Sequence, residues 1–350
     1  MTELTDPTEL TVLADHESTV EAGADGGRVP VAAAHPPRGL GWTLESHGLC
    51  RGDACVVVRD REAVEAGDRV DLLGVARALD RPALVDVATA TAAIGAPSDV
   101  RRRALAGGPA PDFALPDLDG ELRSLGSFPG RRVLVTFATW CGCAYDLPGW
   151  QALRDELAGD GIEVVAVAID DDPDVVRPFA AGLDLPVLVD RDHTLTELYA
   201  ISNVPTVVWI DERDRIARPN AVAFGTDTFR GFTGVDSETH KDAVREWART
   251  GRVDVEADPA DVVGDLSEDE LQARLHFRIA AHLRRTDRPE DASRHFARAV
   301  ELAPHDWTVR RAAMPLQGVD PFGDEFFAMA AEWEAAGRPY HGLAAERTDG

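Results

Sequence analysis

Two cysteines separated by one residue, Cys141 and Cys143, are the strongest chemical signal in the sequence. They follow an apolar run over residues 133–138, which predicts a buried strand, and they precede an amphipathic run over residues 144–157, which predicts a helix. Backbone N–H groups and the positive end of a helix dipole favour an anion at such a turn. Because the thiolate is the reactive form of cysteine, this placement predicts thiol or disulfide chemistry.

A second cysteine pair, Cys50 and Cys55, brackets a four-residue loop. Residues 40–44 and 54–58 are typical of short strands, so we expect a hairpin with these two cysteines near opposite positions. Three interpretations are open: a second redox pair that relays electrons, a structural pair of thiols or hairpin disulfide, and a four-thiolate metal site shared with Cys141 and Cys143. The spacings fit a zinc ribbon poorly, so we expect no metal.

The composition excludes several classes of protein. The 350 residues carry a formal net charge of −26, with 36 Lys and Arg against 62 Asp and Glu. This balance argues against binding to nucleic acid or to an anionic membrane. No apolar run reaches the roughly 18 residues that a membrane span needs, and no secretory signal is visible at the N-terminus. We therefore expect a soluble, cytoplasmic protein, in which four cysteines are not a disulfide scaffold.

Shifts in composition divide the chain into six expected parts. These are a disordered acidic tail (1–35), a small N-terminal α/β module (36–106), a catalytic domain (107–250), a polar linker (251–265), a helical region (266–338) and a C-terminal tail (339–350).

Strand and helix patterns alternate through the catalytic domain. Strands are predicted at 133–138, 163–169, 186–189, 205–210 and 215–218, and helices at 145–158, 173–182, 193–200 and 237–250. Such alternation predicts an α/β sheet with parallel crossovers, and the polar turn at 211–214 predicts an antiparallel hairpin at its edge.

The helical region has apolar spacing over residues 271–283 and 288–302 that resembles one tetratricopeptide unit. A solenoid normally needs three such repeats. We therefore expect a helical cap packed on the catalytic domain, with a peptide-binding array as the alternative.

Several separate motifs in the catalytic domain resemble the thioredoxin superfamily over about residues 108–250. They are Pro111-Asp112-Phe113, Trp140-Cys141, Asp146 with Pro148, and Val204-Pro205-Thr206. More narrowly they resemble the redoxin branch, which contains the alkyl hydroperoxide reductase/thiol-specific antioxidant proteins and thiol-disulfide oxidoreductases. The resemblance implies a thioredoxin-like three-layer sandwich.

The same resemblance implies roles for individual residues. Cys141 is expected to be the nucleophile and Cys143 the resolving cysteine, with Trp140 shielding them. The peptide bond before Pro205 is expected to be cis, which leaves the backbone of Val204 to pair with substrate. Asp146 is either a proton carrier or an acid in the first turn of a helix, where the dipole favours it.

One departure from the family concerns the cysteine spacing. The family usually separates its cysteines by two residues, and here only Gly142 lies between them. A smaller disulfide ring is strained, and strain makes a disulfide easier to reduce. Strain of ~2 kcal/mol corresponds to roughly 40 mV.

We therefore expect a thiol-disulfide oxidoreductase acting on a protein or small-molecule disulfide or thiol. No cofactor is expected, and electrons come from a thiol donor. One alternative is an antioxidant peroxidase that reduces peroxide at Cys141, although Ala138 stands where typical peroxiredoxins have Thr or Ser. Another is a redox-switched binding protein that uses the helical tail.

Overall fold

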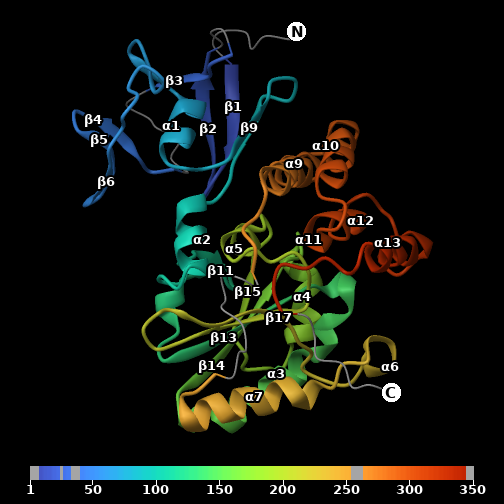
Figure 1. Cartoon of the computed structure of the whole chain (residues 1–350). Coiled ribbons are helices and arrows are strands. Elements are labelled where there is room, and N and C mark those ends of the chain that lie inside the picture. Colours follow the sequence, from blue (N-terminus) through green and yellow to red (C-terminus); the bar gives the residue numbers. More distant parts are fainter. Residues whose placement is uncertain (1–7, 24–26, 33–39, 254–262, 344–350) are drawn as a thin grey trace. The chain divides into compact units, whose positions relative to one another are not determined.

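The computed structural model describes residues 8–23, 27–32, 40–253 and 263–343. The chain forms two compact units, and each is built from two separate stretches of sequence. The first unit comprises Met1–Asp99 with Ser267–Pro304, and the second comprises Val100–Leu266 with His305–Gly350. Figure 1 shows their helices and strands.

The first unit is organised around a seven-stranded sheet of order β7-β8-β3-β2-β1-β10-β9. Its strands are β1 (Thr8–Leu13), β2 (Glu17–Ala22), β3 (Pro30–Ala32), β7 (Glu65–Ala66), β8 (Arg69–Asp71), β9 (Ala83–Asp86) and β10 (Thr91–Ile94), with helix α1 at Leu72–Ala78. β1 pairs antiparallel with β2 and parallel with β10. The β1–β10 pair therefore joins residues that lie about eighty positions apart in the sequence.

The prediction of a disordered tail over residues 1–35 is wrong for its described part. β1 and β2 lie inside the sheet, and Leu10 and Val12 are fully buried in its core. The acidic residues of these strands face away from the core, for example the exposed Glu9. Short alternating strands give a weak local signal, and these become stable only by pairing with β10, far along the chain.

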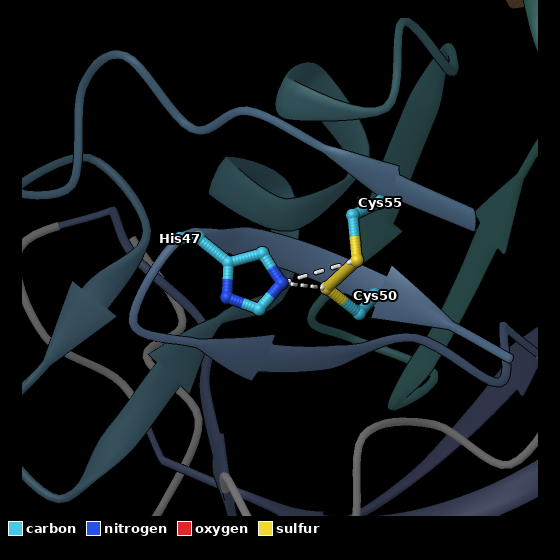
Figure 2. Close-up of side chains that lie close together, drawn as sticks. All are labelled: His47, Cys50 and Cys55. Carbon is cyan, nitrogen blue, oxygen red and sulfur yellow. Dashed lines mark hydrogen bonds between the residues drawn. A yellow bond between two sulfur atoms is a disulfide. The ribbon is translucent and has the colours of Figure 1, made fainter. Parts of the chain in front are cut away.

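A separate three-stranded sheet carries the second cysteine pair. It consists of β4 (Thr43–Glu45), β5 (Gly48–Arg51) and β6 (Ala54–Val56), in that order. Cys50 of β5 lies directly opposite Cys55 of β6, and the two form a disulfide (Figure 2). The opposition of the cysteines was expected. The pairing of 40–44 with 54–58 was wrong, because β5 lies between these strands.

Two long helices complete the first unit. α9 (Glu268–Arg285) and α10 (Pro289–Leu302) pack on each other, and α9 also packs on β9 and β10. The Arg278 guanidinium of α9 donates to the Ile94 carbonyl of β10 at 3.0 Å. The prediction of one helical region over 266–338 that caps the catalytic domain is therefore wrong for its first half, because these two helices belong with the N-terminal sheet. Apolar helix faces alone do not specify which sheet they cover.

The second unit contains the expected α/β sheet, of order β15-β14-β13-β16-β17. Its strands are β13 (Arg131–Phe137), β14 (Ile162–Ala168), β15 (Val187–Val189), β16 (Thr206–Ile210) and β17 (Ile216–Val222). β13, β14 and β15 are parallel, whereas β16 and β17 are antiparallel. The central strand β13 is almost wholly buried, as its apolar run predicts.

Helices surround this sheet, and a short hairpin precedes it. The helices are α2 (Ser98–Leu105), α3 (Leu147–Leu157), α4 (Pro173–Ala180), α5 (Thr194–Leu198), α6 (Arg230–Thr233), α7 (Ser237–Thr250), α11 (Trp307–Arg310), α12 (Ala313–Leu316) and α13 (Asp324–Ala335), and the hairpin is β11 (Leu115–Pro116) with β12 (Leu122–Arg123). α3 and α7 lie side by side (Figure 1). Trp247 of α7 stacks on Trp209 of β16 with ring centroids 5.0 Å apart.

Parts of the predicted linker and C-terminal tail lie outside the described residues. Within the described part of the chain, no helix combines the length and apolar character needed to cross a membrane.

Candidate active site

The central strand β13 leads directly into the Cys141–Cys143 turn. Two short 3₁₀ helices, Thr139–Cys141 and Cys143–Asp146, follow the strand, and α3 begins only at Leu147. Gly142 joins the two 3₁₀ helices with φ of 78°, in the left-handed region that glycine tolerates best. A Cβ added there would also lie only 2.8 Å from the Phe229 ring. Glycine is therefore required between the cysteines.

Cys141 and Cys143 form a disulfide and differ in exposure. Cys141 is partly exposed, whereas Cys143 is only 2% exposed. The Cys143 backbone N–H donates to Cys141 Sγ at 3.2 Å, and the Ala138 N–H donates to Cys143 Sγ at 3.5 Å. A donor aimed at a sulfur favours the thiolate over the thiol. The Ala138 carbonyl oxygen lies 3.2 Å from Cys141 Sγ and 3.6 Å from Cys143 Sγ and favours the thiol, so each sulfur of the reduced pair meets both a donor and an acceptor.

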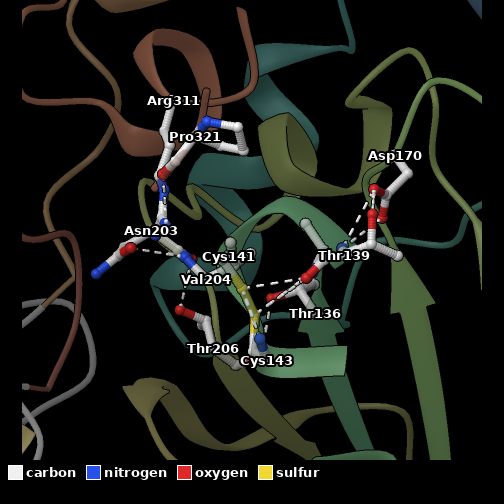
Figure 3. Close-up of a disulfide and its surroundings, with 11 residues drawn as sticks. Thr136, Thr139, Cys141, Cys143, Asp170, Asn203, Val204, Thr206, Arg311 and Pro321 are labelled. Atoms are coloured by element: carbon white, nitrogen blue, oxygen red, sulfur yellow. Dashed lines mark hydrogen bonds between the residues drawn. A yellow bond between two sulfur atoms is a disulfide. The ribbon is translucent and has the colours of Figure 1, made fainter. Parts of the chain in front are cut away.

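The loop before β16 lies beside the disulfide. Figure 3 shows Val204 next to Cys141, and the Val204–Pro205 peptide bond is cis. Asn203 Oδ1 accepts the Val204 N–H at 2.8 Å, and the Thr136 hydroxyl of β13 donates to the Thr206 carbonyl at 2.9 Å. The Val204 N–H is therefore already used within the loop.

Asp146 is completely buried at the start of α3. It makes no side-chain cap bond to the helix; instead its Oδ1 accepts the Thr226 hydroxyl at 2.5 Å and the Thr226 N–H at 3.1 Å. Burial raises the pKa of Asp146 to about 6, although the Thr226 bonds and the Lys241 charge favour the carboxylate. This geometry disfavours a helix-capping role. A carboxyl that titrates near neutrality suits proton transfer.

Asp170 is a site residue that the sequence analysis missed. It follows β14 and is 3% exposed; it accepts the Thr139 backbone N–H at 3.0 Å and the Thr139 hydroxyl at 2.5 Å. Burial raises its pKa to about 6 as well. The carboxyl ends of the parallel strands β13 and β14 meet at one edge, so an Asp directly after the second strand was a usable signal.

Arg311 was also missed, and no local signal indicates it. It follows α11, is 4% exposed, and its guanidinium carbon lies 5.8 Å from the Trp140 ring centroid and 4.0 Å from that of Phe326. It donates to the Pro321 carbonyl at 3.1 Å, and no carboxylate of the described residues pairs with it. Burial lowers its pKa to about 10. Figure 3 shows the side chain extending toward the Asn203–Val204 loop and the disulfide.

The structure therefore brings together most of the predicted residues. Trp140 is 6% exposed, Cys141 and Cys143 form one disulfide, and Val204 lies beside it (Figure 3). Cys50 and Cys55 are bonded to each other in the first unit.

A cysteine pair at the end of a central strand, flanked by a buried acid and the Val204–Pro205 loop, defines a domain of thioredoxin type. Comparison with known proteins agrees. The AhpC/TSA family matches residues 106–218. The thiol-disulfide oxidoreductase ResA of Geobacillus thermodenitrificans (strain NG80-2) is 31% identical over 116 residues, which are 32% of this chain and 67% of that protein.

A second relative and one solved structure are also similar to this chain. ResA of Oceanobacillus iheyensis (strain DSM 14371) is 33% identical over 134 residues, covering 36% of this chain and 70% of the relative. The exposed lipoprotein thioredoxin Etrx1 of Streptococcus pneumoniae (strain TIGR4) has a solved structure that is 27% identical, with a TM-score of 0.32, covering 40% of this chain and 98% of that one. The chain belongs to the redoxin branch of the thioredoxin superfamily and is an oxidoreductase.

Proposed function

We propose that the second unit catalyses thiol–disulfide exchange, with Cys141 attacking the substrate and Cys143 resolving the intermediate. The observation that carries this assignment is the asymmetry of the pair. Cys141 is partly exposed and its sulfur receives the Cys143 N–H at 3.2 Å, whereas Cys143 is buried directly behind it. A nucleophile must reach the substrate, and a resolving thiol must reach only the nucleophile.

The reaction balances in two exchanges. The Cys141 thiolate attacks one sulfur of the substrate disulfide, forms a mixed disulfide and releases the other sulfur as a thiolate that takes up a proton. The Cys143 thiolate then attacks Cys141 Sγ, which forms the Cys141–Cys143 disulfide and releases the second substrate thiolate. A thiol electron donor returns two electrons and two protons to restore the dithiol.

Neighbouring residues support these steps in distinct ways. Asp146, with its pKa raised to about 6, is the proposed proton carrier. The Val204 carbonyl pairs with an extended substrate, while Pro205 holds the loop against the sulfurs. Trp140, buried against Arg311, shields the disulfide from water.

The alternatives to thiol–disulfide exchange, peroxide reduction and peptide binding, each predict a different measurable behaviour. Peroxide reduction at Cys141 would first form a sulfenic acid, which Cys143 would resolve as a disulfide. Tetratricopeptide-like binding by α9 and α10 would need a peptide partner and no turnover. Cytoplasmic location and the absence of membrane or nucleic-acid partners stay predictions from the sequence.

Replacement of each cysteine separately tests the assignment. We expect Cys141→Ser to abolish reduction of insulin disulfides, because no nucleophile remains. Cys143→Ser should accumulate a mixed disulfide with the substrate, detected as an adduct by non-reducing mass spectrometry, because the first exchange proceeds and the second cannot.

Peroxide consumption by the same proteins is the matched comparison. Turnover of insulin that survives in Cys141→Ser contradicts the assignment, and an adduct that forms on Cys143 in that variant would reverse the two roles. Fast peroxide consumption without insulin reduction would favour the peroxidase.

A further inference from the structure

Two sulfur atoms and one nitrogen atom that could serve as ligands converge on the small three-stranded sheet of the first unit. His47 Nε2 lies 3.2 Å from Cys50 Sγ and 3.3 Å from Cys55 Sγ (Figure 2). His47 comes from the turn between β4 and β5, and the cysteines are the directly paired residues of β5 and β6. All three ligand atoms lie within 4.8 Å of one another.

The turn that presents His47 is held in place by neighbouring groups. The Arg61 guanidinium donates to the carbonyls of Glu45 at 3.0 Å and Ser46 at 3.2 Å. A Cβ on Gly48 would overlap the Val56 carbonyl, so the turn packs closely on β6. The fold therefore holds the backbone of the turn from which the exposed His47 side chain reaches both sulfurs.

A purely structural disulfide does not account for this arrangement. The strands are already paired, and a cross-link between residues five apart closes only a small loop, which limits its entropic gain. Cys55 and His47 are exposed, so reductants and ions reach them. The imidazole nitrogen, within 3.3 Å of both sulfurs, therefore adds a third ligand atom to the reduced pair.

We propose that His47, Cys50 and Cys55 form a redox-gated site for a thiophilic divalent cation of the zinc class. Two thiolates and one imidazole are the ligand set that zinc accepts, and a fourth position remains for water or for Glu45, whose Oε2 lies 3.7 Å from His47 Nε2. The disulfide has no thiolate to offer, so only the reduced pair binds the cation.

The gate operates through a balanced two-electron step. A dithiol reductant transfers two electrons and two protons to the Cys50–Cys55 disulfide, giving two thiols and the oxidised reductant. The cation then binds both sulfurs, releases their two protons and takes the neutral imidazole as its third ligand. This site is independent of the exchange reaction proposed for Cys141 and Cys143.

Cobalt(II) is the probe for the test, because its thiolate complexes absorb visibly and zinc displaces it. The full-length double variant Cys141→Ser/Cys143→Ser is reduced with a phosphine so that only Cys50 and Cys55 supply thiols. We expect one cobalt per chain with sulfur-to-metal charge-transfer bands, displacement by one zinc, and no binding before reduction.

His47→Ala in the same background should weaken zinc binding at least about tenfold, since even outer-shell partners are worth 10–100-fold. His16→Ala, which removes another exposed histidine of the first unit, should leave the affinity unchanged. Circular dichroism checks the fold of each reduced protein. Absence of zinc binding by the folded reduced protein, unchanged affinity in His47→Ala, or unfolding on reduction alone would overturn the proposal.

Discussion

At the scale of single residues, the site is defined by buried acids as much as by its cysteines. Asp146 and Asp170 are both at least 97% buried, and burial raises the pKa of each to about 6. Asp146 packs beside Thr226, whereas Asp170 holds the backbone of Thr139 two residues before Cys141. In the folded protein each carboxyl therefore stays protonated at pH values where it is ionised in the unfolded chain.

Asp146→Asn tests this at the level of stability and of rate. The folded pKa of Asp146 is about 6 against 3.8 unfolded, so the folded state binds more protons between these values and stability falls as pH rises through this window. We compare the free energy of unfolding of the variant with that of the parent at each pH by denaturant titration. The difference should favour the variant by about 2 kcal/mol more at pH 8 than at pH 4.

The pH profile of insulin reduction gives the second readout. The parent should show an inflection near pH 6 that Asp146→Asn lacks. Asp155→Asn, an exposed change on the same helix, should keep both the inflection and the parent stability. An inflection that persists in Asp146→Asn would assign the proton to another group.

At the scale of elements, the turn between β13 and α3 carries the chemistry. It is built from two 3₁₀ helices joined at Gly142, and this tight path brings the Cys143 N–H onto Cys141 Sγ. The turn is also covered by the loop that carries Phe229, which leaves no space for a side chain at position 142. The positive φ of the backbone and the packing of Phe229 therefore both favour glycine at position 142.

Gly142→Ala should therefore cost stability and activity together. A residue with a Cβ at φ of 78° costs about 1–2 kcal/mol, and displacement of Phe229 adds to it. Gly159→Ala is the matched control, because a Cβ there meets nothing within 4 Å. Equal unfolding midpoints in urea for the two variants would show that the turn tolerates a side chain.

At the scale of the whole molecule, the last quarter of the chain completes both units. His276 Nδ1 of α9 lies 2.8 Å from His295 Nδ1 of α10, and His295 Nε2 lies 3.1 Å from an Asp86 carboxylate oxygen of β9. The following segment brings Arg311 to Trp140 in the second unit. Deleting the helical region would therefore damage both units.

Low pH should reduce the stability of the first unit through protonation of His276. Burial, with the charge of His295, lowers the pKa of His276 to about 4, so the unfolded chain binds the extra proton between about pH 6.5 and 4 and stability falls as pH drops through that window. Because this side chain is partly exposed, the expected effect is small. Relative to the parent, the free energy of unfolding of His276→Gln in urea should be about 1 kcal/mol more favourable at pH 4.5 than at pH 7.5.

The exposed His16 provides the control for the acid destabilisation assigned to His276. His16→Gln should leave the pH dependence of unfolding as in the parent. A parent-like acid response in His276→Gln would place the sensitive group elsewhere.

The sequence by itself determined the thioredoxin-like domain. The apolar run of β13, the Cys141–Cys143 spacing and the Val204–Pro205 loop are local signals, because buried parallel strands and reactive turns need particular residues at short range. Only the tertiary structure decided the place of β1, the division of the C-terminal helices and the roles of Asp170 and Arg311. These depend on pairing and burial between distant stretches, and an isolated Asp or Arg looks the same in sequence whether it faces solvent or a disulfide.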